Sequence, residues 1–351
     1  DQKECTMRRI TAFVVCGLFA VCGLAAQTEL NYWIAGDLAY YPPNLGGYDI
    51  ENFSPIDYST VTHEDLEDVY GPTSDEGRDL GGQAVEMRAT FGQELKLPFL
   101  RGNSILTAGN NVKIRLKEEI SPVTANLVIE TVFTPVAFLL IDSALSIGTG
   151  WAVGDISGLS YNTTENTFDP APFEGAVTTA EVGATFQFDF GLLVPGDWTH
   201  IVTVYRAGLQ YEEFTAAGAN DPWMWQADNG ENFNGWNWKQ TGVLGYQMPA
   251  LQHIDTAGVL VETEQRITKQ DESTMDNGGW GSDFMKVYVS PFLVVQINSN
   301  HALTVQLQFA RGRDYTEETI GNAHFSYREV DTDSPVYWYF RRAALSYRYE
   351  Y

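Results

Sequence analysis

Apolar and polar side chains alternate, residue by residue, in many stretches of this 351-residue chain. The clearest stretch runs from Glu181 to Leu192, where every second residue is apolar or small. An alternation with period two predicts a β-strand with one apolar face, and about eleven residues are enough for a tilted strand to cross a bilayer. Similar alternation recurs at 85–91, 112–117 and 303–309, and no apolar run of transmembrane-helix length follows residue 26.

The whole pattern predicts an all-β fold of about twelve strands, and between ten and fourteen strands fit it. The expected strands are 29–41, 83–97, 105–118, 123–133, 136–150, 181–192, 199–213, 241–250, 257–268, 284–297, 302–312 and 336–351. Most connections after odd-numbered strands are long, including 42–82 and 214–240, and those after even-numbered strands are brief. Long loops on one rim and tight turns on the other are typical of a membrane barrel. A secreted soluble β-sandwich is the alternative, since its strands alternate in the same way.

The last seven residues place Leu345, Tyr347, Tyr349 and Tyr351 on one face of a strand and polar residues on the other. A final strand that ends on an aromatic residue resembles the terminal assembly signal of bacterial outer-membrane β-barrels. With the long acidic loops, it also resembles surface barrels of diderm bacteria, spirochaetes among them. The resemblance implies a porin-like, up-and-down antiparallel transmembrane barrel, and recognition of these four residues by the outer-membrane assembly machinery.

The start of the chain has the features of an export signal. Met7 is followed by Arg8 and Arg9, by an apolar run from Ile10 to Leu24, and by two alanines. This order is that of a cleaved secretory signal peptide. We therefore expect upstream residues and a signal peptide at 1–26, one barrel domain at 27–351, and location in the bacterial outer membrane.

Composition limits the possible partners. The chain has 21 Lys+Arg and 46 Asp+Glu, of which the leader holds three and two, so that 18 and 44 remain and the net charge is −26. Such an acidic protein is a poor match for nucleic acid. All three cysteines, Cys5, Cys16 and Cys22, lie in the leader. The mature chain therefore has no disulfide framework and no cysteine-ligated metal site.

Charged residues at the polar positions of the strands predict the barrel lumen, because a charge facing lipid at mid-bilayer costs about 2 to 4 kcal/mol. We expect Glu86 and Arg88 to lie across from three bases of the next strand and to form a locally positive patch near the outer rim. The charges either pair and plug a narrow barrel or act on a water-filled constriction, and a narrow pore is favoured. The expected lumen residues are Glu86, Arg88, Lys113, Arg115, Lys117, Glu130, Asp142, Asp189 and Arg206.

One long loop is rich in tryptophan, with Trp223, Trp225, Trp236 and Trp238 inside sixteen residues. Exposed indole rings are costly, so they either pack on one another, plug the barrel mouth or offer a stacking surface to a sugar or an apolar ligand. Packing within the loop is favoured, and ligand contact is the alternative.

The favoured function is an outer-membrane channel for passive diffusion of small hydrophilic solutes. The main alternative is a surface-exposed, adhesin-type binding barrel whose loops engage ligands. A remote alternative is an enzyme that resembles outer-membrane phospholipases, because His324 and Ser326 stand two residues apart as a possible base and nucleophile. No third residue is placed beside them, and the other histidines lack metal-ligand spacing. We therefore expect no enzymatic activity, no metal and no cofactor.

Overall fold

The computed structural model describes most of the barrel domain. The described residues are 28–41, 85–268, 284–313, 316 and 330–351, with gaps at 155, 165–166, 195, 197, 219–220, 227–231, 249–252 and 334. The expected leader at 1–26, the whole acidic loop at 42–82 and the pair His324 and Ser326 lie outside these residues. In the part that is described, no helix has the length and apolar character needed to span a membrane.

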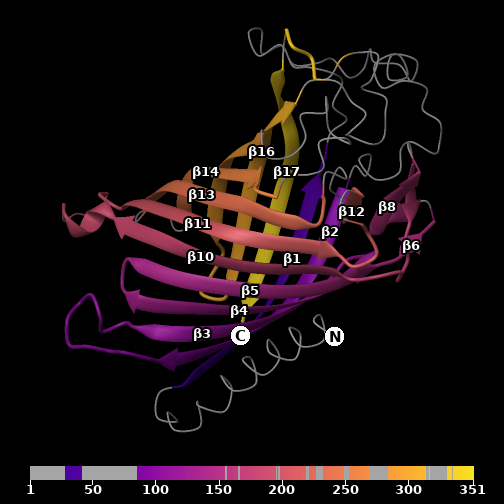
Figure 1. Ribbon diagram of the computed structural model, residues 1–351. Coiled ribbons are helices and arrows are strands. Elements are labelled where there is room, and N and C mark those ends of the chain that lie inside the picture. Colours follow the sequence, from indigo (N-terminus) through magenta and orange to yellow (C-terminus); the bar gives the residue numbers. More distant parts are fainter. Residues whose placement is uncertain are drawn as a thin grey trace.

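Twelve antiparallel strands form one closed barrel in the described part of the chain, and the first of them pairs with the last (Figure 1). The expected fold class, strand number and up-and-down order are confirmed. The strands are β1 (Glu29–Tyr40), β2 (Val85–Pro98), β3 (Asn111–Ile120), β4 (Thr124–Val136), β5 (Leu139–Gly150), β10 (Val177–Asp189), β11 (Ile201–Phe214), β13 (Gly235–Gln247), β14 (Ile254–Arg266), β15 (Met285–Gln296), β16 (His301–Arg313) and β17 (Val336–Glu350).

The turn between β2 and β3 is longer than the sequence pattern predicts. The third strand was expected from residue 105, but it begins at Asn111. The preceding segment folds on itself, since the Gly102 N–H donates to the Thr107 carbonyl at 3.1 Å. The Asn110 side chain also donates to the Leu100 carbonyl at 3.0 Å. Backbone groups that a strand would pair with a neighbour are therefore used inside the turn.

The two rims of the barrel differ as expected. One rim carries the connections 41–84, 121–123, 151–176, 215–234, 267–284 and 314–335, and we call it the long-loop rim. The other, the short-turn rim, carries 99–110, 137–138, 190–200, 248–253 and 297–300, including the 3₁₀ turn η1 (Phe190–Leu192). In Figure 1 the small loop strands gather beyond the long-loop end of the barrel.

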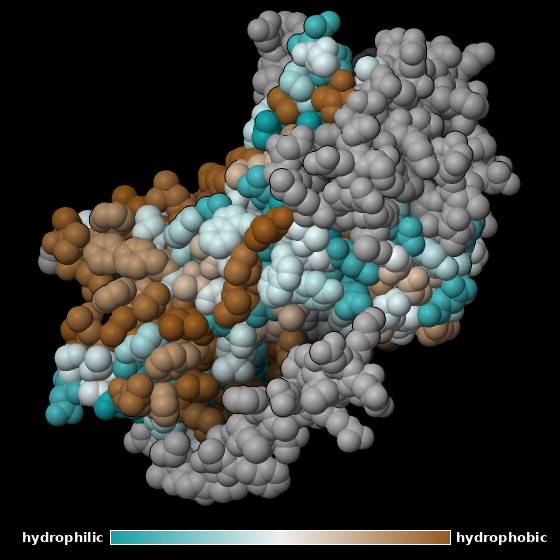
Figure 2. Space-filling view, in the orientation of Figure 1, coloured by the Kyte–Doolittle hydropathy of each residue, from teal (hydrophilic) through white to brown (hydrophobic). Residues whose placement is uncertain are grey.

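The outer surface of the wall is apolar. Outward positions alternate with inward ones, so Ile34 and Leu38 of β1 are 41% and 44% exposed while Asp37 between them faces inward. Figure 2 shows apolar residues spread over the barrel wall, with hydrophilic residues toward the loops. Among the described strands, acidic and basic residues at outward positions all lie within three residues of a strand end: Glu118, Glu213, Asp255, Arg311 and Arg313. This distribution suits a wall surrounded by lipid, where charge is tolerated only near the interfaces.

Two long loops share a small folded unit at the long-loop rim. Strand β8 (Leu159–Thr164) pairs with β9 (Thr167–Pro170) and with β12 (Trp223–Trp225), and β6 (Ala152–Val153) pairs with β7 (Ile156–Ser157). Side chains from the loops pack against the ends of β10 and β11 in one apolar core, which we call the loop core: Leu159, Ala171, Val177, Phe214 and Trp223. These two loops are therefore attached to the barrel by buried apolar contacts.

Candidate functional site

The inward wall of β2, β3 and β4 carries a continuous set of ion pairs. Glu94 of β2 accepts from Arg115 of β3 at 2.7 Å and lies 3.5 Å from the Lys113 ammonium. Arg115 also reaches Glu130 of β4 at 3.6 Å, and Lys117 donates to the same carboxylate. These five residues, the Glu94 network, alternate acid and base across three strands.

The register corrects the expected arrangement around these bases. Across from Lys113, Arg115 and Lys117 stand Lys96, Glu94 and Gly92, and not Glu86 and Arg88. The turn extends to residue 110, so β3 begins later than expected and its last residue, Ile120, pairs with Ala89. Glu86 and Arg88 therefore lie beyond the residues of β2 that pair with β3. Each of the three bases contacts Glu94 or Glu130, so the expected positive patch is compensated in part, with three bases against two acids.

Arg88 and Glu86 lie closer to the long-loop rim, in two separate contacts. The Arg88 guanidinium is 3.0 Å from Asp37 of β1 and 3.8 Å from Glu119 of β3. Glu86 accepts from the Tyr41 hydroxyl at 2.7 Å, and Arg342 of β17 donates to the same hydroxyl at 2.9 Å. These contacts tie the seam strands β1 and β17 to β2.

Tyr41 lies just beyond the end of β1. Burial raises the pKa of the Tyr41 hydroxyl, and the Glu86 carboxylate raises it further against the opposing effect of Arg342. The phenol therefore stays protonated at neutral pH and can donate its hydrogen bond to Glu86.

Asp142 and Arg206 come together although a strand lies between them. Arg206 of β11 reaches across β10 to Asp142 of β5 at 2.5 Å, and it also contacts Glu181 of β10 at 2.5 Å. The crossing passes over Gly183, where a Cβ would come within 2.6 Å of the guanidinium. A glycine on the intervening strand therefore opens the space for this pair.

A further cluster of charges lies where β11, β13 and β14 approach the long-loop rim. Glu212 accepts from Asn237 at 2.7 Å and lies 3.5 Å from Arg266. Arg266 also donates to the Phe233 carbonyl in the loop, and Lys239 pairs with Glu264 at 3.2 Å. The Arg266 and Glu212 side chains are only 6% and 11% exposed, so they belong to the packed support of the loop, whereas Lys239 and Glu264 are 30% and 28% exposed.

Asp189 is apart from the other candidate lumen residues. It ends β10 at the short-turn rim, where it accepts from the Gly191 N–H and lies 2.8 Å from His200. It therefore caps a turn and is not joined to the ion pairs farther along the wall.

The inward charges between the rims keep contact with solvent. The exposed fractions are 35% for the Arg88 side chain, 31% for Arg115 and 22% for Arg206. Their partners Asp37 and Asp142 are 32% and 19% exposed. In a closed barrel these side chains are exposed to the interior, so accessible space remains beside the ion pairs.

The four tryptophans do not form one surface. Trp223 is 1% exposed in the loop core, and the Trp225 ring lies beside Gly148 of β5. Trp236 is 46% exposed and packs against Tyr211, and Trp238 is paired with Leu209 on the outward face of the wall. A joint stacking surface for a ligand does not fit this arrangement, because period two on β13 turns Trp236 and Trp238 outward.

Sequence reasoning missed about half of the residues in these networks. The charged partners it did not name are Asp37, Glu94, Glu119, Glu181, Glu212, Lys239, Glu264, Arg266 and Arg342. Most of them occupy the same alternate positions as a named charge on their own or a neighbouring strand, so parity could have found those. Glu264 and Arg266 lie on β14, and neither β14 nor its neighbours β13 and β15 carries a named charge. Among the described residues, no group of three or more His, Cys, Asp or Glu is arranged to hold a metal ion.

Comparison with known proteins finds similar solved structures but no matching sequence family. No family model and no curated protein matches the chain. The translocator domain of the autotransporter NalP from Neisseria meningitidis is similar at 8% identity and a TM-score of 0.36, over 98% of this chain and 97% of that one. The outer membrane phospholipase A of Escherichia coli is similar at 9% identity and a TM-score of 0.31, over 92% and 96%. The outer membrane channel DcaP of Acinetobacter baumannii is similar at 9% identity and a TM-score of 0.32, over 93% and 97%.

The chain is a β-barrel of the outer-membrane type. The sheet is closed, its outer wall is apolar and its inner wall is polar. These features of the chain itself support a bilayer around the barrel. At such identities the resemblance to the three solved proteins concerns the fold, and it carries no activity over to this chain.

Proposed function

We propose that this protein is an outer-membrane channel through which small hydrophilic solutes diffuse. The observation that carries the proposal is the row of inward ion pairs that remain partly exposed between the two rims. Water and small polar solutes can pass a wall of compensated charge without meeting a high electrostatic barrier. Because acids and bases alternate along the wall, we expect weak selectivity between small cations and anions.

Single-channel recording in planar bilayers tests this proposal. The purified barrel is expected to give discrete conductance steps that scale with salt concentration. A properly folded protein that inserts and conducts nothing would refute it. Folding is checked separately by the change in electrophoretic mobility on heating.

A surface-binding barrel is the second candidate, and the loop core favours it. Loops that pack through Trp223 and Phe214 form a folded unit that could present a ligand surface, while the barrel serves as an anchor. Under this proposal a variant that unfolds the loop unit loses ligand binding and leaves the conductance near zero. The phospholipase-like alternative depends on His324 and Ser326, which lie outside the described residues. Hydrolysis of phospholipid by the purified barrel would support the phospholipase-like alternative.

The location and topology are part of the same proposal. We propose export through a cleaved signal peptide at 1–26, insertion guided by Leu345, Tyr347, Tyr349 and Tyr351, and a long-loop rim that faces the cell exterior. Since the cysteines all lie in the leader, single cysteines can be introduced for labelling. On intact cells a membrane-impermeant maleimide should label Glu174→Cys at the long-loop rim and not Ser104→Cys at the short-turn rim. The reverse pattern would invert the topology.

A further inference from the structure

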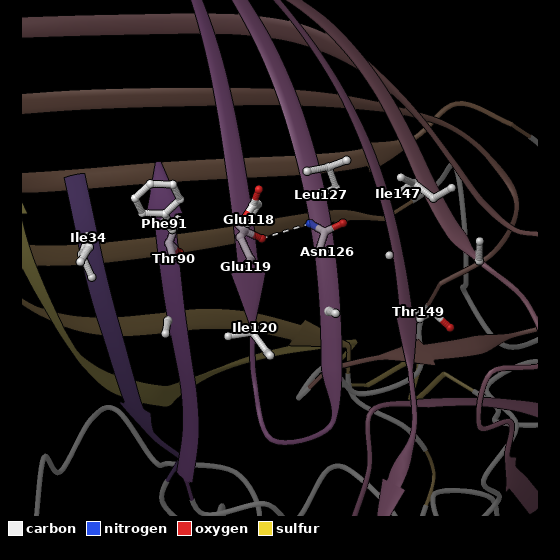
Figure 3. Close-up of a pocket in the computed structure, with 14 residues that line it drawn as sticks. Ile34, Thr90, Phe91, Glu118, Glu119, Ile120, Asn126, Leu127, Ile147 and Thr149 are labelled. Carbon is white, nitrogen blue, oxygen red and sulfur yellow. Dashed lines mark hydrogen bonds between the residues drawn. The ribbon is translucent and has the colours of Figure 1, made fainter. Parts of the chain in front are cut away.

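A groove of about 680 Å³ lies along the wall made by β1 to β5, on the half nearer the long-loop rim (Figure 3). Its volume is within the usual range of small-ligand sites. Most of the side chains that line it occupy outward positions, among them Ile34, Phe91, Leu127 and Ile147. Ala89, Ala125 and Ala176 also line the groove, and their small side chains leave room on this part of the surface. The groove therefore opens toward the surrounding lipid.

One carboxylate interrupts this apolar surface. Register places Glu118 of β3 directly between Phe91 of β2 and Leu127 of β4, and those residues face Ile34 and Ile147 on the next strands. In Figure 3 the Glu118 side chain lies among these labelled residues. Glu118 is the only acidic or basic residue at an outward position of β1 to β5, among the residues that the structure describes.

Glu118 also differs from the inward acids in having no ion-pair partner among the described side chains. The neighbouring Glu119 faces inward, where it contacts Arg88 and accepts from Asn126 at 3.0 Å. Glu118 points to the opposite face, which carries no base on these strands. It lies two residues before the end of β3, which is where a charge on the outer wall is least costly.

The occupant must therefore supply both an apolar chain and a positive charge. A second copy of this barrel is disfavoured, because a two-fold interface through this face would bring two Glu118 carboxylates toward each other. The Glu118 carboxylate would likewise repel a lipid headgroup with a net negative charge. We infer that the groove binds a lipid whose acyl chain lies along Phe91 and Leu127 and whose headgroup ammonium pairs with Glu118. This inference requires the barrel to lie in a bilayer, and it does not require the barrel to conduct.

Native mass spectrometry of the detergent-solubilised barrel tests this inference. The protein is mixed with equal amounts of phosphatidylethanolamine, which has an ammonium headgroup, and phosphatidylglycerol, which has none. The wild type should retain phosphatidylethanolamine over phosphatidylglycerol by about fivefold, the ratio given by one exposed ion pair of about 1 kcal/mol. Glu118→Gln should bring the ratio close to one without lowering the amount of folded protein.

Two further variants separate the groove from the charge. Glu213→Gln removes another outward carboxylate near a strand end, on β11 and outside the groove, and should leave the lipid ratio unchanged. Ala125→Trp fills the groove and should reduce retention of both lipids. An unchanged ratio in Glu118→Gln would overturn the inference. So would phosphatidylglycerol binding that depends on Mg²⁺ and is lost in EDTA, or a change of oligomeric state in Ala125→Trp, which would assign the groove to a second copy.

Discussion

Arg206 on β11 lies over Gly183 on β10, so closely that a Cβ at position 183 would be 2.6 Å from its Nη2 atom. The glycine lets the guanidinium cross a whole strand and reach Asp142 on β5. Two strand spacings separate β11 from β5, which is roughly 10 Å. Only a long side chain over an unobstructed position can bridge that distance.

We predict that Gly183→Val destabilises the barrel by about 1 to 3 kcal/mol, because the valine displaces Arg206 and leaves Asp142 without its partner. The free energy of unfolding in urea, followed by tryptophan fluorescence in detergent, measures the effect. Gly36→Val is the matched control, since a Cβ at Gly36 meets nothing within 4 Å. Equal losses in the two variants would mean that the glycine acts through strand conformation alone.

Neutralising the bases of the Glu94 network should make the channel prefer cations. In the triple variant Lys113→Gln, Arg115→Gln, Lys117→Gln, the carboxylates of Glu94 and Glu130 lose their contacts with these bases. The reversal potential across a salt gradient should shift toward cation selectivity. The shift should be larger below about 0.1 M salt, where the Debye length exceeds about 10 Å.

Lys96→Gln serves as the control for that shift, since Lys96 pairs with the exposed Glu29 at the short-turn rim. It should change the reversal potential much less than the triple variant. If the triple variant matched the wild type at low salt, the path of the ions would not pass this network.

Removing Tyr349 to Tyr351 should strongly reduce membrane insertion, because the last strand both closes the seam with β1 and carries the proposed assembly signal. The Tyr351 N–H donates to the Tyr32 carbonyl at 3.0 Å, and the rings of Tyr349 and Tyr351 are 4.7 Å apart. The yield of heat-modifiable barrel in membranes is the measurement. Tyr246→Ala, another aromatic at the short-turn rim, stacked on Trp198, should insert nearly normally. Similar yields for both would contradict the proposed role of the last strand.

Trp223→Ala should unfold the loop core and leave the barrel intact. Truncating a buried tryptophan costs about 3 to 5 kcal/mol, and Trp223 packs against Phe214 with ring centroids 6.2 Å apart. We expect rapid proteolysis within 151–176 while heat-modifiable mobility is retained. Trp236→Ala, at a side chain that is 46% exposed, should remain resistant. Protease resistance of Trp223→Ala would show that the unit is held by other contacts.

The sequence by itself determined which side chains of a strand share its apolar outer face, and it predicted about twelve strands within a range of ten to fourteen. A strand has period two, so the alternation around Phe186 or Leu307 sets the facing without knowledge of the partners. The sequence also predicted that the first strand pairs with the last, because an open sheet edge in lipid would leave backbone N–H and C=O groups unpaired.

Only the tertiary structure decided which charges meet. The register between β2 and β3 depends on a turn held by Asn110, and a displacement of a few residues replaced the expected partner Arg88 by Glu94. The pair of Arg206 and Asp142 depends on a glycine between two strands that are not neighbours. Alternation along one strand carries no information about its offset from the next, because that offset is set by turn geometry and by contacts between residues far apart in the chain.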